Sequence, residues 1–145
     1  MYTRYITGGL VGLTIAAAAI VTGPALAETV SYKAVLQGAQ EVPPTASKGS
    51  GTADLTYDTV AKKLTWKVTF SGLGGPATAA HFHGPAEAGK NAGVAVPIPG
   101  TASPMDGTVT LTDAQAADLV GGKWYVNVHT AENKGGEIRG QVVKK

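Results

Sequence analysis

The stretch that decides the fold is Leu64-Thr65-Trp66-Lys67-Val68-Thr69-Phe70, in which apolar and polar residues alternate without a break. Successive side chains of an extended strand point to opposite faces, so this pattern predicts a strand with one apolar face. Segments with the same period, separated by glycine and proline, are 30–36, 49–57, 78–83, 93–98, 108–111, 123–129 and 137–143. Strands of this number and spacing predict an all-β protein, either an antiparallel β-sandwich or a small Greek-key barrel.

One short helix is expected among these strands. Thr112-Asp113-Ala114-Gln115 fits a capping box, in which the threonine hydroxyl and the glutamine side chain each bond the other residue's backbone amide. Good helix formers follow over 114–120. Gly121-Gly122 then suits a left-handed end. We therefore expect about two helical turns that connect two strands.

The first 27 residues have the pattern of a cleaved secretory signal peptide. A basic start, Met1-Tyr2-Thr3-Arg4, precedes an apolar stretch over 10–21 and the small-residue sequence Ala25-Leu26-Ala27. The apolar stretch is shorter than the roughly 20 residues that cross a bilayer, which favours cleavage over an uncleaved anchor. We expect an exported protein, periplasmic or extracellular, with one domain over 28–145 and no membrane span after cleavage.

The composition excludes several classes of protein. The chain has 145 residues, no cysteine and a formal net charge of +2. Without cysteine, an exported domain relies on its core or on a bound metal rather than on disulfides. The basic residues are scattered, so the chain lacks the basic stripe that nucleic-acid binding requires.

The three histidines of the chain lie on the polar faces of two predicted strands. His81 and His83 are two residues apart, so they point the same way and opposite to Phe82. His129 ends the alternating segment 123–129 on its polar face. If the two strands are neighbours, three imidazoles converge on one patch.

Three imidazoles on one patch predict a metal site. Neutral imidazole is the commonest metal ligand, and three ligands leave a coordination position for water, an anion or a substrate. Nitrogen ligands allow zinc and copper, and the affinity order favours copper among divalent ions. The alternative is that the histidines are surface or turn residues, bonded to backbone and never metallated.

Further polar residues are expected around the three histidines. Tyr125 and Asn127 share the face of His129, and the last strand places Glu137 and Arg139 on its polar face. Glu137 would orient a ligand imidazole, as carboxylates next to metal ligands do. Arg139 would attract a small anion to the open position. The alternative for both charged residues is a solvated surface ion pair.

Four motifs, in order, resemble the CHRD (chordin) domain family: Glu41-Val42-Pro43-Pro44, Ala79-Ala80-His81-Phe82-His83-Gly84-Pro85-Ala86, Tyr125-Val126-Asn127-Val128-His129-Thr130 and Gly136-Glu137-Ile138-Arg139-Gly140-Gln141. The resemblance covers essentially the whole chain after residue 27. It implies a β-rich, exported or extracellular domain that occurs in multidomain proteins and as single-domain bacterial secreted proteins. All three histidines fall inside these motifs.

The candidate site is also similar to that of the copper–zinc superoxide dismutases, β-sandwich proteins with a His-x-His copper pair and an arginine beside the copper. The chain departs from them because it has no further histidine and no cysteine. One hypothesis is therefore an exported copper or zinc protein, and with copper an oxidoreductase acting on a small anion such as superoxide. The others are a non-catalytic module that binds an unknown extracellular protein, and a structural envelope protein with inert histidines.

Overall fold

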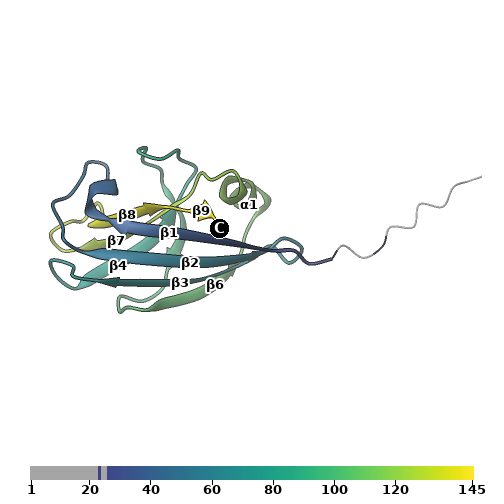
Figure 1. The fold of residues 1–145 in the computed structure, drawn as a ribbon, viewed down its shortest axis with the longest axis horizontal. Helices are drawn as coiled ribbons and strands as arrows, with labels where there is room; N and C mark the ends of the chain where they lie inside the picture. Colours follow the sequence, from purple (N-terminus) through teal and green to yellow (C-terminus); the bar gives the residue numbers. More distant parts are fainter. Residues whose placement is uncertain (1–22, 24–25) are drawn as a thin grey trace, which may run out of the picture.

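Figure 1 shows the fold of the chain in a computed structural model, which describes residue 23 and residues 26–145. The signal-peptide prediction for residues 1–27 falls almost wholly outside these described residues.

Nine strands form one antiparallel sheet in the order β5-β4-β7-β8-β1-β2-β3-β6, with β9 paired to β1. The two end strands, β5 and β6, approach each other, so the curved sheet is nearly closed around a common interior (Figure 1). The predicted all-β sandwich or small barrel is therefore confirmed. The strands are β1 (Thr29–Gln37), β2 (Ser50–Asp58), β3 (Lys63–Ser71), β4 (Ala77–His83), β5 (Val94–Ile98), β6 (Met105–Thr110), β7 (Tyr125–Thr130), β8 (Ile138–Gln141) and β9 (Val143–Lys144).

The alternating pattern of β3 determines which of its side chains lie in the core. Leu64, Trp66 and Val68 are buried on its inner face, as predicted, while the polar residues between them face outward. Trp66 meets Phe82 of β4 edge to face, with ring centroids 5.4 Å apart, and this contact packs two distant strands of the sheet together. Because Phe82 points into the core, its neighbours His81 and His83 must point out of it.

The short helix forms as predicted. It is α1 (Asp113–Val120), and both bonds of the capping box are present between Thr112 and Gln115. Gly122 has a φ of +71°, and its amide donates to Leu119 while that of Lys123 donates to Asp118, which is the Schellman ending. In the described part of the chain, no helix combines the length and apolar character needed to cross a membrane.

The strand β5 runs through Pro97 to Ile98, in agreement with the predicted segment 93–98. Pro97 is tolerated because β5 is an end strand, where a missing N–H costs no ladder bond on the open side. β6 begins at Met105 rather than at Thr108 because it pairs with β3 as far as Val68. A single 3-10 turn, η1 (Gly38–Gln40), follows β1.

Candidate metal-binding site

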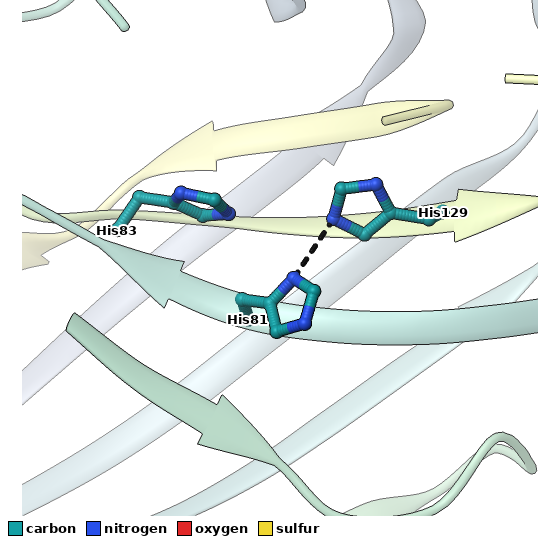
Figure 2. Close-up of side chains that lie close together, drawn as sticks. All are labelled: His81, His83 and His129. Atoms are coloured by element: carbon teal, nitrogen blue, oxygen red, sulfur yellow. Dashed lines mark hydrogen bonds between the residues drawn. The ribbon is translucent and has the colours of Figure 1, made fainter. Parts of the chain in front are cut away.

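The three histidines lie on the outer side of two paired strands. β4 carries His81 and His83, and its antiparallel neighbour β7 carries His129. The register sets His81 opposite Asn127 and Ala79 opposite His129, so His81 and His129 are diagonal neighbours. Figure 2 shows the three rings gathered on one side of these strands.

The imidazoles are close enough to one another to bind the same ion. One nitrogen from each ring lies within 4.8 Å of those from the other two. Nδ1 of His81 and Nε2 of His129 are 3.0 Å apart and hydrogen-bonded, the contact drawn as a dashed line in Figure 2. The His81 ring also meets the His83 ring edge to face, with centroids 5.5 Å apart.

Backbone carbonyls fix the orientation of two of the rings. Nδ1 of His129 lies 2.9 Å from the Lys134 carbonyl, and Nδ1 of His83 lies 3.0 Å from the Ala92 carbonyl. A carbonyl only accepts, so Nδ1 of His129 carries the proton when that imidazole is neutral, and its Nε2 holds a lone pair. His81 must then donate its Nδ1–H to Nε2 of His129. His83 has an acceptor oxygen at each nitrogen, Ala92 O at Nδ1 and Asn127 Oδ1 at Nε2, so its neutral ring donates to one of them at a time.

Loops cover the outer face, and this was not foreseen from the polar pattern. His129 is 8% exposed and Arg139 is 2% exposed, whereas the sequence suggested a solvent-facing surface. The covering segments follow β1, β4 and β7, and those after β4 and β7 contribute the Ala92 and Lys134 carbonyls. The loop after β4 has the composition of a mobile segment, yet it is anchored at residues 90–92.

Burial favours the neutral form of the imidazoles. Desolvation lowers the pKa of His81, and the neighbouring His129 and His83 lower it further. Desolvation also lowers the pKa of His83, against weaker hydrogen bonds that raise it. Both rings are therefore held as neutral imidazoles near neutral pH, the state in which they bind metals.

Asn127 and Tyr125 both contact His83, as their place on the shared face suggested. The Asn127 side-chain oxygen lies 3.0 Å from Nε2 of His83. The Tyr125 ring is parallel to the His83 ring, with centroids 4.8 Å apart and an interplanar angle of 1°. The Tyr125 hydroxyl also bonds Ala92, the residue whose carbonyl holds His83.

Arg139 is in the same region but does not face the histidines. Its guanidinium carbon lies 3.4 Å from the centroid of the Tyr125 ring. His83 already covers one face of that ring, and two groups this close would overlap on the same face, so Arg139 occupies the other. Its charge still lowers the pKa of His83 slightly.

Glu137 is buried, at 1% exposed, but its carboxylate does not orient an imidazole as we had expected. It accepts hydrogen bonds from Ser47 Oγ at 2.6 Å, from the Gly74 amide at 2.7 Å and from Thr130 Oγ1 at 2.7 Å. Burial raises the pKa of this carboxyl, but these hydrogen bonds together outweigh burial and lower it. Glu137 therefore ties two loops to the end of β7 at the edge of the site, and it forms no ion pair with Arg139.

Glu41 is the residue that sequence reasoning missed. It follows η1, is 5% exposed, and its carboxyl lies beside Asn127 and Arg139. Burial raises the pKa of Glu41 to about 7, although the Arg139 charge and an Asn127 hydrogen bond act in the opposite direction. Its position in a loop gives no periodic pattern, and the only sequence indication was its place in the Glu41-Val42-Pro43-Pro44 motif.

Comparison with known proteins gives the family. The CHRD domain matches residues 32–142, a range that contains the three histidines, Glu41 and Arg139. Comparisons with curated proteins and with solved structures found no match. CHRD domains are common in extracellular proteins, which agrees with the location expected from the sequence. The match spans most of the chain, and the chain belongs to the CHRD domain family.

Proposed function

We propose that this domain binds one transition-metal ion through His81, His83 and His129, with copper as the native ion and zinc as the alternative. The observation that carries the proposal is the set of three imidazole nitrogens within 4.8 Å of one another. Among the described residues, no other group of three potential ligands of this kind is found. Three neutral nitrogen donors suit copper and zinc, and the affinity order of divalent ions favours copper.

The geometry fits an ion after a small adjustment. Metal–nitrogen bonds are about 2.0–2.1 Å, so two nitrogens on one ion are at most about 4.2 Å apart. The 3.0 Å between His81 and His129 is within this limit, whereas the widest separation must close by at least about 0.6 Å. Nε2 of His83 must also turn away from the Asn127 amide. The Nδ1–H bonds to Ala92 and Lys134 are of the kind that orients ligand imidazoles.

The same site supports a redox function on a small anion. Three protein ligands leave a position open, and the partly exposed His81 gives that position its access to solvent. Copper held by the three histidines would supply one-electron chemistry: its Cu(II) form would oxidise one superoxide to dioxygen, and its Cu(I) form would reduce a second, with two protons, to hydrogen peroxide. The buried Arg139 acts on such an anion only through its field, across the Tyr125 ring.

Two measurements test the metal and the redox activity separately. A copper(II) electron paramagnetic resonance spectrum with hyperfine splitting from several nitrogens supports a copper site, and preferential retention of zinc from an equimolar mixture supports zinc. Superoxide decay by copper-loaded protein should exceed decay by the same concentration of free copper and by the His129→Ala variant. Equal rates would remove the enzymatic part and leave the metal site.

The second candidate is a non-catalytic extracellular module that binds a protein partner. The observation that favours it is that each imidazole has a hydrogen-bond partner within the protein: His81 on His129, His83 on Ala92 or Asn127, and His129 on Lys134. The histidines then stabilise the loops without an ion. Partner capture from an extracellular or envelope extract by metal-free protein, unchanged in the His81→Ala variant, would support this candidate. The absence of any partner would instead favour a structural envelope protein.

A further inference from the structure

The inference concerns Arg139 and rests on the proposed metal site. A charged residue beside a metal centre is expected to act by attracting an anion. Here, however, the guanidinium is 2% exposed and is separated from the His83 ring by Tyr125. Its contacts point to another role.

Both terminal nitrogens of Arg139 bond the loop that follows β4. Nη1 donates to the Asn91 side-chain oxygen at 2.9 Å, and Nη2 donates to the Lys90 carbonyl at 2.5 Å. The side-chain Nδ2 of Asn91 in turn donates to the Val42 carbonyl at 2.9 Å. This bond connects the loop to the segment after β1. Two donors in one rigid plane fix the orientation of this loop as well as its distance.

The next residue, Ala92, is the one that holds His83. Its carbonyl accepts from Nδ1 of His83 at 3.0 Å and from the Tyr125 hydroxyl at 3.2 Å, and its amide donates to the same hydroxyl. The Tyr125 ring lies between the Arg139 guanidinium and the His83 imidazole. Arg139 thus contacts His83 indirectly by two routes, one through the loop backbone and one through the aromatic ring.

We propose that Arg139 is a positioning residue for His83: by clamping residues 90–92 and stacking on Tyr125 it holds the Ala92 carbonyl at Nδ1 of His83. This contact favours the Nδ1–H tautomer over donation from Nε2 to Asn127, and so leaves Nε2 its lone pair for a metal. This role depends on the planar, two-donor shape of the side chain. Lysine has the same charge but is a point donor that cannot bond both loop acceptors while stacking on the ring.

The test uses the full-length chain and the variant Arg139→Lys, which keeps the charge and removes the shape. Long-range proton–nitrogen NMR of the metal-free protein reports the tautomer of each histidine. In the wild type we expect the Nδ1–H tautomer at His83 and at His129. In Arg139→Lys we expect mixed tautomers at His83 only, because Arg139 bonds residues 90 and 91, whereas His129 is held by the Lys134 carbonyl. Copper(II), measured against a competing chelator, should bind about 10- to 100-fold more weakly.

Asn91→Ala is the second variant and covers the case in which Arg139→Lys fails to fold. It removes one of the two clamp bonds and should shift His83 in the same direction, again with His129 unchanged. Lys67→Gln removes an exposed positive charge on β3 and is the matched control; it should not change the tautomer of His83 or of His129. A His83 tautomer that is unaffected in both variants overturns the proposal. Equal changes at all three histidines also overturn it, since they would mean a general structural role.

The proposed function and this inference fail in different ways. A wild-type protein that binds no copper contradicts the metal site, while the tautomers of the metal-free variants still decide the role of Arg139. If copper binds normally to Arg139→Lys and the His83 tautomer is unchanged, the metal site stands and the positioning role is wrong.

Discussion

Nδ1 of His81 lies 3.0 Å from Nε2 of His129, and the Lys134 carbonyl on the far side of the His129 ring sets the direction of this hydrogen bond. His129 must keep its proton on Nδ1, so His81 is the donor. A metal ion that binds both of these nitrogens has to take the place of the His81 proton. The pair is thus assembled in advance at a separation that suits two ligands of one ion.

The first prediction follows from this bond. Zinc binding should move the His81 proton from Nδ1 to Nε2, whereas His129 should keep its proton on Nδ1 because the Lys134 carbonyl needs it. Long-range proton–nitrogen NMR of metal-free and zinc-loaded protein checks both tautomers, since zinc is diamagnetic. An His81 tautomer that stays the same after loading would contradict ligation through Nδ1.

The second prediction concerns the buried carboxyl of Glu41. Its folded-state pKa is raised to about 7 from 4.5, so between these values the folded protein holds a proton that the unfolded chain has lost. Stability contributed by the protonated form is present at low pH and is lost as the pH rises through 7. The shift corresponds to roughly 3 kcal/mol.

The variant Glu41→Gln, which stays neutral, should therefore be more stable than the wild type at pH 8, by about 1–3 kcal/mol, and similar to it at pH 5. Urea unfolding at the two pH values measures the difference. Glu87→Gln, at an exposed position, is the control and should have little effect at either pH. If the stability of Glu41→Gln relative to the wild type fell between pH 5 and pH 8, the predicted direction of the Glu41 contribution would be wrong.

The third prediction compares two adjacent glycines. A Cβ on Gly136 would lie 2.2 Å from Glu41 Oε1 and 2.5 Å from Asn127 Nδ2, and the φ of Gly136 is +131°. Gly136→Ala should cost about 2–4 kcal/mol of stability, through strain and displacement of these side chains, and should perturb His83 through Asn127. Gly135→Ala, with nothing within 4 Å of the added carbon, should change stability by less than about 0.5 kcal/mol. Thermal unfolding and NMR of both variants check this, and equal losses would mean that the contact at Gly136 is unimportant.

The fourth prediction concerns Glu137, whose carboxylate holds two loops, through Ser47 and Gly74, to the end of β7 at Thr130. Hydrogen bonds to a charged group are strong, so Glu137→Gln should lose roughly 2–4 kcal/mol at pH 7. The folded-state pKa is lowered, so this stability is present above the ordinary value and is lost as the pH falls through the folded-state pKa. Urea unfolding should therefore show that the stability difference between the variant and the wild type narrows as the pH falls below the ordinary carboxyl pKa value of 4.5. A gap that is constant with pH would argue against a charge-dependent role.

The strands and the helix could be predicted because their patterns are local. The alternation at 64–70 and the capping box at Thr112 are properties of neighbouring residues, and both recur in the structure. The faces of His81 and His83 followed from Phe82 in the same way. The pairing of β4 with β7 brings His129 to these two residues. From the sequence this pairing could only be assumed.

The surroundings of the histidines could not be predicted because they depend on loops. The loops after β1, β4 and β7 bury the polar face, so Arg139 and Glu137 are not surface residues. Their partners lie far away in the chain: Glu137 bonds Ser47, and Arg139 bonds Lys90. Neither the two-residue period of a strand nor the 3.6-residue period of a helix relates such distant positions. The buried Glu41 was missed for the same reason.

The central claim is that His81, His83 and His129 hold one metal ion, and the copper content of purified protein tests it most directly. After loading with copper(II) and desalting, elemental analysis should find about one equivalent in the wild type and in the Lys67→Gln control. The His81→Ala and His129→Ala variants, shown to be folded by circular dichroism, should retain less than about a tenth of an equivalent. A wild type that retains no more than this, or variants that retain as much copper as the wild type, would contradict the claim.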